Sequence, residues 1–217
     1  KFVYFDSEWG NKVKENSTIP SFKIGNNNDS NLRILGEKLF PKISLKIQIN
    51  EVKQDINLNV TGPNFNLNFL LALSMAYFSE KLNIQNYDEN FKNIQNPKGR
   101  FEIINYKSNK IVVDYAHTPD AIKTTVDFVT QYFSNVIVVF GAGGDRDTKK
   151  RLLMGNATKN ANQVIITNDN PRHEDPQKIA TDILEGCDKE KTVVILDRKE
   201  AITYGINQLK DNSVLLV

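Results

Sequence analysis

The sequence predicts an α/β protein whose second half forms a Rossmann-like, doubly wound and mostly parallel sheet. Short β-branched runs alternate with helical patterns from Arg100 to the last residue. Polar or glycine-rich loops follow these runs, as they do where the strands of such a sheet end near a ligand. The 217 residues are 40% hydrophobic and 25% charged, which suits a globular chain with a packed core. A β-rich region followed by helices is predicted to precede this sheet.

Residues 1–62 are predicted to be rich in β-strands. Ile43–Ile49 alternates strictly between apolar and polar residues, which is typical of a half-buried strand. Asp55–Val60 alternates in the same way, and Val52-Lys53-Gln54 is the predicted connection of a hairpin between the two. Residues 25–30 are predicted to form a polar loop.

Two helices are expected next, after which the chain is interrupted. Asn66–Leu82 is apolar along most of its length, which predicts a helix buried on most sides. Tyr87–Ile94 predicts a shorter helix. Asn96-Pro97-Lys98-Gly99 consists of turn-forming and helix-breaking residues, so we expect one domain at residues 1–97 and another at 98–217.

Strands and helices are expected to alternate through the second domain. The strands are predicted at Lys110–Tyr115, Asn135–Phe140, Gln163–Thr167, Thr192–Leu196 and Ser213–Val217, and the helices at Asp120–Phe133, Lys149–Ala161, Gln177–Leu184 and Arg198–Leu209. Thr118 and Asp175 are predicted N-caps, each followed by a proline at the first helical position. Right-handed crossovers would bring the loops that follow the strands to one edge of the sheet.

Composition excludes several classes of protein. The net charge of +2 gives no strong field toward nucleic acid or a membrane surface, so neither is an expected partner. No run of about 18 apolar residues is present, so no membrane insertion is expected. Cys187 is the single cysteine, which excludes an intrachain disulfide and fits a reducing, cytoplasmic location. Both ends are predicted strands, and no signal peptide precedes them, so we expect a fragment of a longer protein.

The loop from Thr167 to Pro176 carries polar side chains at the expected end of a buried strand. Asp169 can face a cation, and the guanidinium of Arg172 can bind a carboxylate or phosphate through two parallel hydrogen bonds. A plainer interpretation is a polar turn that ends a strand and caps a helix. The loop alone does not decide between them.

A second polar loop follows the first strand of this domain. Asp114 could accept hydrogen bonds from a ribose or hold a cation-bound water, and His117 could pair with a phosphate or carboxylate. Alternatively, Asp114 holds a turn together and His117 packs at the start of a helix. Arg100, near the domain boundary, could reach a nucleotide phosphate or pair with Glu102.

A glycine-rich loop, Gly141–Asp147, follows the next strand. Its glycines permit close backbone approach and positive φ angles, and its N–H groups could bind an anion, which Arg146 would favour. The spacing is neither the dinucleotide fingerprint nor a P-loop. Lys149, Lys150 and Arg151 can be explained as the solvated start of a helix.

Four of these segments occur in an order and at a spacing similar to those of the motifs of a known protein family. They are Gly99-Arg100-Phe101-Glu102, Asp114–Asp120, Gly141–Asp147 with Lys150-Arg151 and Met154-Gly155, and Asp169–Arg172 followed by Glu174-Asp175-Pro176. Together they resemble the Mur ligases, the ATP-dependent amino-acid ligases of peptidoglycan precursor synthesis. Residues 62–72 are similar to the family's Gly-x-Phe-Asn-x-x-Asn segment, although Phe65-Asn66 and Asn68 depart from its usual offset.

The resemblance implies a three-domain cytoplasmic enzyme, of which this chain holds the end of the central ATPase domain and most of the C-terminal amino-acid-binding domain. The family's P-loop, magnesium ligands and carbamylated lysine would precede residue 1, and its Gly-Lys-Gly-His-Glu loop would follow residue 217. No catalytic residue and no metal ligand is therefore assigned within the chain, and the chain alone is expected to be inactive. ATP and Mg²⁺ are the implied cofactors of a monomeric full-length enzyme.

The resemblance also implies roles for individual residues. The nucleotide-binding residues would be Arg100, Asp114, His117 and Asn68, and the amino-acid pocket would be Arg146, Asp169, Asn170, Pro171 and Arg172. The Asp-Asn-Pro-Arg form is typical of members that add meso-diaminopimelate to UDP-N-acetylmuramoyl-L-alanyl-D-glutamate through an acyl phosphate. Two alternatives stay open, namely a sibling ligase that adds lysine or another amino acid, and a non-catalytic α/β ligand-binding module.

Overall fold

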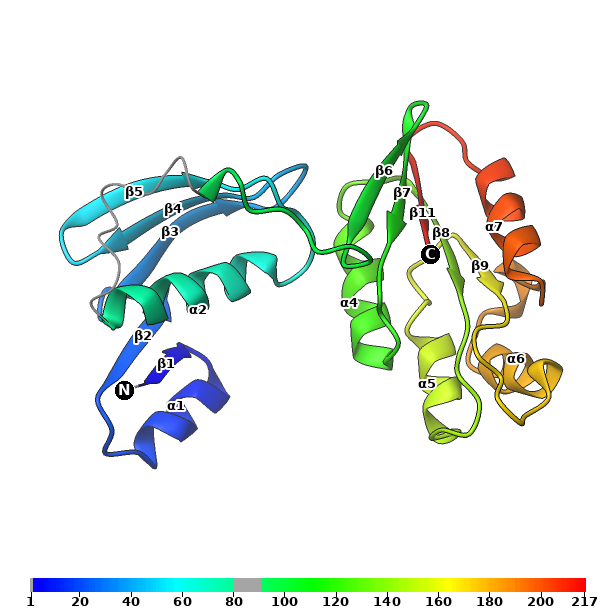
Figure 1. The fold of residues 1–217 in the computed structure, drawn as a ribbon, viewed down its shortest axis with the longest axis horizontal. Coiled ribbons are helices and arrows are strands. Elements are labelled where there is room, and N and C mark those ends of the chain that lie inside the picture. Colours follow the sequence, from blue (N-terminus) through cyan, green and yellow to red (C-terminus); the bar gives the residue numbers. More distant parts are fainter. Residues whose placement is uncertain (1, 80–90) are drawn as a thin grey trace. The chain divides into compact units, whose positions relative to one another are not determined.

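The computed structural model describes residues 2–79 and 91–217 (Figure 1). The chain divides into two compact units, Lys1–Asn96 and Pro97–Val217. Each unit has a sheet of its own, and each is described by itself below.

The first unit is built on a five-stranded sheet with the order β1-β2-β3-β4-β5. Its strands are β1 (Phe2–Phe5), β2 (Ser21–Gly25), β3 (Leu32–Lys38), β4 (Ser44–Ile49) and β5 (Val52–Asn57). Strands β1 to β3 pair in parallel, and β3 to β5 pair antiparallel. Leu70 and Leu73 of α2 (Phe65–Phe78) join the buried side chains of the sheet in one core. This unit is therefore β-rich at its start, as predicted.

The hairpin between β4 and β5 turns earlier than predicted. Ile49 pairs with Val52, so Asn50 and Glu51 form a two-residue turn, and Val52-Lys53-Gln54 belongs to the strand. Asn50 has φ 53°, a left-handed conformation that asparagine tolerates better than most residues. The prediction failed because β5 is an edge strand whose first two residues are exposed, so its apolar alternation begins only near Ile56.

Helices of the first unit also differ from the prediction. Helix α1 (Glu8–Glu15) was not predicted; it is short, and its two large apolar residues, Trp9 and Val13, are both exposed. Helix α2 ends at Phe78 rather than Leu82, and it is not buried on most sides, since Met75 is 57% exposed. The helix expected at Tyr87–Ile94 lies largely outside the described residues.

The second unit is a six-stranded sheet with the order β10-β9-β8-β11-β7-β6. Its strands are β6 (Glu102–Tyr106), β7 (Asn109–Val113), β8 (Asn135–Phe140), β9 (Gln163–Ile166), β10 (Thr192–Val194) and β11 (Ser213–Leu216). All neighbours pair in parallel except β6 and β7. The predicted doubly wound, mostly parallel sheet is therefore present, with one additional antiparallel strand, β6, that the sequence did not predict.

Helices lie on both faces of this sheet (Figure 1). They are α4 (Pro119–Val129), α5 (Lys149–Asn156), α6 (Pro176–Leu184) and α7 (Arg198–Asn207), and a short 3₁₀ helix, η2 (Lys189–Lys191), precedes β10. Helices α4, α5 and α6 pack side by side along the path from β7 to β10. Helix α7 returns from β10 to β11 and packs on Ile137, Val139, Ile165 and Leu215. This reversal is what right-handed crossovers require when the chain turns back across a sheet.

The strand and helix positions predicted for this unit are confirmed, with ends that shift by a few residues. The predicted N-caps Thr118 and Asp175 accept hydrogen bonds from the N–H groups of Ala121 and Gln177. Helix α4 ends at Val129 and α5 at Asn156, both several residues earlier than predicted, and turns follow them. Because β7, β8 and β9 run in the same direction, the loops that follow them all begin at the same edge of the sheet.

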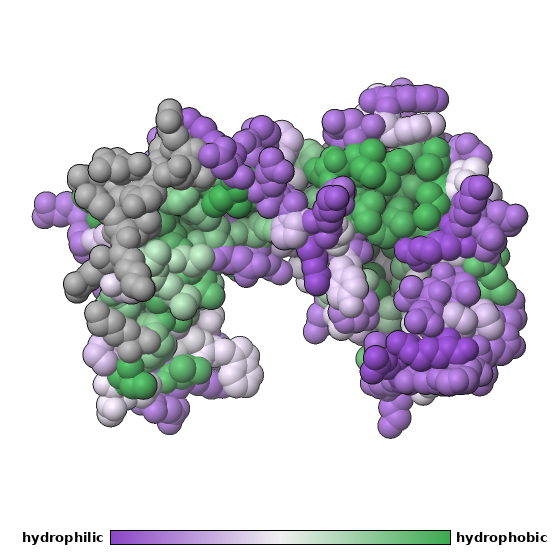
Figure 2. Space-filling view, in the orientation of Figure 1, coloured by the Kyte–Doolittle hydropathy of each residue, from purple (hydrophilic) through white to green (hydrophobic). Residues whose placement is uncertain are grey.

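A hydrophobic area is visible on the second unit near the positions of β6 and β7 (Figure 2). Ile104 of β6 is 47% exposed and pairs with Ile111 of β7.

Among the described residues, no helix is both long enough and apolar enough to span a bilayer.

Candidate functional site

The loops that follow β8 and β9 run against each other at the carboxyl edge of the sheet. The N–H of Gly144 donates to the carbonyl of Asn170 at 2.8 Å, and the N–H of Thr167 donates to the carbonyl of Phe140 at 2.9 Å. A Cβ atom at Gly144 would overlap the carbonyl oxygen of Pro171. Close backbone approach was predicted for this glycine-rich loop, but the partner is the neighbouring loop.

Positive φ angles in these loops fall on residues other than glycine. Asp145 and Arg172 each have φ 51°, whereas the described glycines with positive φ are Gly62 and Gly99. A left-handed backbone costs a residue with a Cβ on the order of 1 kcal/mol or more. The loop contacts around Asp145 and Arg172 therefore have to hold both residues in place.

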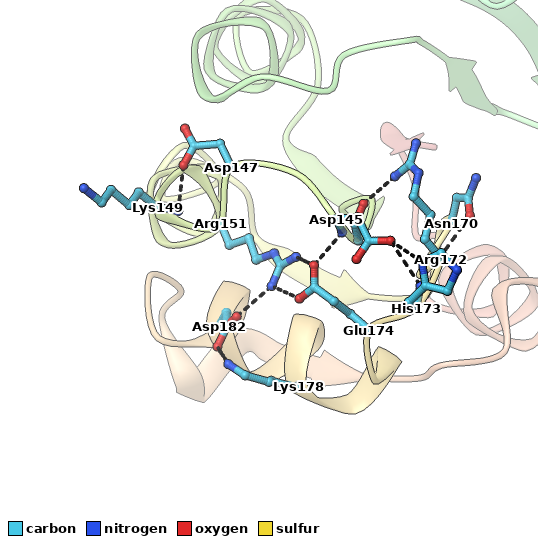
Figure 3. A network of polar contacts seen from close by, with 11 residues as sticks. Asp145, Asp147, Lys149, Arg151, Asn170, Arg172, His173, Glu174, Lys178 and Asp182 are labelled. Atoms are coloured by element: carbon cyan, nitrogen blue, oxygen red, sulfur yellow. Dashed lines mark hydrogen bonds and ion pairs between the residues drawn. The ribbon is translucent and has the colours of Figure 1, made fainter.

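Arg172 and Asn170 are brought together with the glycine-rich loop (Figure 3). Nη1 of Arg172 donates to the carbonyl of Gly144 at 2.5 Å, and the N–H of Arg172 donates to Oδ1 of Asn170 at 3.3 Å. A Cβ at Gly143 would lie 2.8 Å from Nη1, so Gly143 leaves room for this side chain. Only one of the five guanidinium N–H donors is needed for Gly144, and Arg172 is exposed, so the others can meet a ligand.

Arg146, Asp169 and Pro171 lie on the same two loops. Arg146 and Asp169 are both exposed. Within the part of the chain that the structure describes, Asp169 forms no ion pair with Arg146 or with Arg172. The carbonyl of Pro171 accepts a hydrogen bond from the N–H of Glu174 at 3.0 Å. The structure therefore places all five predicted pocket residues on adjoining loops, and their joint action on a ligand stays a prediction.

A buried guanidinium underlies these loops, and it contradicts the interpretation of Arg151 as part of a solvated helix start, whereas Lys149 is exposed as that interpretation predicts. Arg151 is 1% exposed. Its Nη1 and Nη2 donate to the two carboxylate oxygens of Glu174 at 2.9 and 2.7 Å, and Nη1 also donates to Oδ2 of Asp182 at 2.9 Å (Figure 3). The guanidinium of Arg151, followed by the N–H of Asp145, lowers the pKa of Glu174 to about 2.

Sequence reasoning missed this cluster of Arg151, Glu174 and Asp182, although one signal was present. Arg151, Met154 and Gly155 are the buried residues of α5, and their spacing puts them on one helical stripe. An arginine at a core position of such a stripe needs buried acceptors, because an unpaired buried charge is very costly. That rule predicts carboxylate partners without identifying them.

Asp114 holds the turn after β7. Its two carboxylate oxygens accept hydrogen bonds from the N–H groups of Phe101 and Ala116, each at 2.8 Å. Its own N–H donates to the carbonyl of Val217 at 3.0 Å. These contacts fit the structural interpretation of Asp114, and its binding to a nucleotide stays a prediction.

Arg100 and His117 both contact the ring of Tyr115, a residue that the sequence analysis did not single out. The guanidinium carbon of Arg100 lies 4.2 Å from the ring centroid of Tyr115, and the Tyr115 and His117 rings are 4.6 Å apart. Tyr115 is 58% exposed. Glu102 accepts a hydrogen bond from the N–H of Gly99 at 3.0 Å. Arg100 and His117 are thus brought together.

Asn68 belongs to α2 of the first unit, and the other predicted nucleotide-binding residues belong to the second unit. Its side chain is exposed. The neighbouring Asn66 is buried and donates from Nδ2 to Oε2 of Glu37 at 2.7 Å, which ties α2 to β3. A role of Asn68 in nucleotide binding stays a prediction.

A small, half-open pocket lies beneath the carboxyl edge. It has a volume of about 30 Å³ and is lined by residues that include Asp114, Ala116 and Val217. That volume suits a water molecule and is far below the size of a nucleotide pocket. Across residues 2–79 and 91–217, no cluster of three or more His, Cys, Asp or Glu side chains could hold a metal ion.

Comparison with known proteins gives a family match to this unit. Residues 99–217 match the model described as Mur ligase, glutamate ligase domain. Two curated relatives carry the name UDP-N-acetylmuramoyl-L-alanyl-D-glutamate–2,6-diaminopimelate ligase. The one from Rickettsia conorii is 37% identical over 207 residues, which are 93% of this chain and 42% of the relative. The one from Clostridioides difficile is 34% identical over 226 residues, 99% of this chain and 46% of the relative.

A comparison with solved structures also finds a ligase of this kind. A structure of a UDP-N-acetylmuramoyl-L-alanyl-D-glutamate–2,6-diaminopimelate ligase is 27% identical with a TM-score of 0.66, and the alignment covers 99% of this chain and 47% of that one. The chain thus spans less than half the length of each of these three proteins.

Proposed function

The chain belongs to the Mur ligase family, and from this premise we propose that it is part of an ATP-dependent ligase that adds meso-diaminopimelate to UDP-N-acetylmuramoyl-L-alanyl-D-glutamate. Residues 1–97 would be the end of its central ATP-binding domain, and residues 98–217 its amino-acid-binding domain. The observation that carries the proposal is the junction of the two loops at which Arg172 contacts Gly144 and remains exposed. The names of the curated relatives support the substrate.

The proposed reaction has two steps. The γ-phosphoryl group of ATP passes to the D-glutamyl carboxylate, which gives ADP and an acyl phosphate. The amine of diaminopimelate then attacks the acyl carbon, a C–N bond forms as the C–O bond to phosphate breaks, and the amine loses a proton. The protein has to hold two anions and an amine in line and keep water out.

Arg172, Arg146, Asp169 and Asn170 are proposed to bind the amino acid. A guanidinium fork matches the carboxylate at the far end of diaminopimelate, and a carboxylate such as that of Asp169 matches an ammonium group. Lysine has no carboxylate at that end. A lysine-bound pocket would leave Arg172 without its partner, which costs on the order of 2–5 kcal/mol when the charge is desolvated.

Arg100, His117 and Asp114 are proposed to face the nucleotide. The Arg100–Tyr115–His117 cluster supports this assignment, because it places a cation and an aromatic ring on one exposed surface. Asp114 would act mainly by holding Phe101 and Ala116, since both of its carboxylate oxygens already accept backbone hydrogen bonds. The described residues offer no cluster suited to Mg²⁺, so no step is assigned to a metal held by them.

The test is the substitution Arg172→Ala in the full-length ligase. We expect the KM for meso-diaminopimelate to rise on the order of 30-fold or more, the equivalent of ~2 kcal/mol, while the KM for ATP stays nearly constant. Lys159→Ala is the control, because it removes an exposed cation from the turn that follows α5, away from both loops. An unchanged diaminopimelate KM in Arg172→Ala would remove the pocket assignment.

A further inference from the structure

Glu174 joins the two pocket loops to the interior of the second unit. Its carboxylate accepts hydrogen bonds from both terminal nitrogens of the buried Arg151, and its Oε1 also accepts one from the N–H of Asp145 at 2.6 Å. Asp145 directly precedes Arg146, and Glu174 comes two residues after Arg172. One carboxylate therefore connects the backbone on either side of the pocket.

His173 makes a parallel connection between the same loops. Oδ2 of Asp145 lies 2.7 Å from Nδ1 of His173 and accepts the His173 N–H at 3.4 Å (Figure 3). Asp145 is thus held twice, through its N–H by Glu174 and through its carboxylate by His173. Asp145 and Arg172 are also the two residues of these loops with a left-handed backbone, which persists only where surrounding contacts hold it.

Arg151 gives Glu174 a fixed support. It lies on α5, is 1% exposed, and also donates to Asp182 on α6 at 2.9 Å. A carboxylate held by two guanidinium hydrogen bonds loses most of its rotational freedom. The position of Glu174, and through it that of Asp145, is therefore tied to the buried Arg151 of α5 rather than to the loops alone.

We propose that Glu174 is a positioning residue for the amino-acid pocket. It fixes the backbone at Asp145 and thereby the separation of Arg146 and Arg172, so that the pocket fits an amino acid with a second carboxylate at its far end. This inference rests on the proposed function and adds to it a residue that selects the substrate without touching it.

Asp182 provides a matched control. It binds the same Nη1 of Arg151, and its other oxygen lies 3.4 Å from Nζ of Lys178 on its own helix. The structure gives Asp182 no hydrogen bond to either pocket loop within the described residues. Asp182→Asn and Glu174→Gln each remove one carboxylate charge from Arg151, but only Glu174 also accepts the N–H of Asp145. Glu174→Gln should weaken that contact, because a neutral amide oxygen accepts less strongly than a carboxylate and the new NH2 group opposes an Arg151 donor.

The experiment compares both variants with the wild type in the full-length ligase. For Glu174→Gln we expect the meso-diaminopimelate KM to rise about tenfold, with the ATP KM changed less than about twofold, because loop geometry is altered and the nucleotide-side residues are not. For Asp182→Asn both KM values should stay close to the wild type. Hydrogen exchange of the 217-residue chain should show faster exchange at Asp145 and Arg146 in Glu174→Gln only.

Equal kinetic effects of the two variants, or an unchanged diaminopimelate KM in Glu174→Gln, would overturn the positioning role. A Glu174→Gln protein whose exchange at Asp145 matches the wild type would overturn it as well. A wild-type enzyme that ligates no diaminopimelate would instead refute the proposed function, so the two failures are distinguishable.

Discussion

Gly143 and Gly144 meet the Arg172 loop in different ways, although they are neighbours in the sequence. A Cβ at Gly143 would approach the end of the flexible Arg172 side chain at 2.8 Å. A Cβ at Gly144 would overlap the backbone carbonyl of Pro171, which cannot move away without shifting the loop. Gly143 leaves room for the side chain of Arg172, and Gly144 leaves room for the backbone carbonyl of Pro171.

We therefore expect the two alanine substitutions to separate binding from stability. Gly143→Ala should raise the diaminopimelate KM several-fold and change the free energy of unfolding by less than about 0.5 kcal/mol, because only the tip of Arg172 has to move. Gly144→Ala should lower the free energy of unfolding by about 1–3 kcal/mol, as overpacking usually does. Urea denaturation and steady-state kinetics measure both quantities. A Gly144→Ala protein as stable as the wild type would contradict the described loop contact.

Residues on the loops were easier to predict than the residues beneath them. Asn170, Arg172 and the glycines follow buried β-branched runs, so their place at the carboxyl edge follows from the alternation of strands and helices. Arg151 stands in a run of three basic residues, and its acceptors are 23 and 31 positions away in the sequence. Local pattern cannot identify such distant partners, because tertiary packing selects them.

At the scale of elements, the second unit was predicted well and the first unit less well. Buried strands such as β8 and β9 are continuous apolar runs bounded by turn residues. The sequences Thr118-Pro119 and Asp175-Pro176 are typical helix starts, and they predict the N-caps of α4 and α6. Helix α1 has eight residues and none of them is buried, and β5 is an edge strand with a single buried residue, so both elements are weakly marked in the sequence. Elements that are short and bury little are therefore the ones that the sequence analysis placed least well.

The contact between α5, α6 and the loop before α6 should depend on pH. Glu174 has a pKa of about 2 in the folded chain, below its ordinary value of 4.5, because Arg151 and the N–H of Asp145 stabilise the carboxylate. A lowered pKa contributes stability that is complete above the ordinary value and is lost as the pH falls from 4.5 toward 2. The wild-type 217-residue chain should lose stability over this interval more steeply than Glu174→Gln.

Urea denaturation at a series of pH values measures this difference. Asp6 and Asp127 also have lowered pKa values, so both proteins should lose some stability in acid. The difference between the two curves isolates the contribution of Glu174. Parallel curves from pH 6 to pH 2.5 would show that Glu174 is not held by Arg151 in solution.

At the scale of the whole molecule, a shared fold does not by itself decide the substrate. The match of residues 99–217 shows the family and leaves the amino acid open. In the proposed function, we expect the choice of diaminopimelate to depend on the loop from Asp169 to Arg172 and on the contacts that hold it.

The most direct test is a competition between amino acids in the full-length ligase. The enzyme would receive ATP, UDP-N-acetylmuramoyl-L-alanyl-D-glutamate and equal concentrations of meso-diaminopimelate and L-lysine, and mass spectrometry would identify the product. The account predicts that the diaminopimelate product predominates, since only that substrate supplies a carboxylate to Arg172. A predominant lysine product, or no product that depends on an added amino acid, would contradict it.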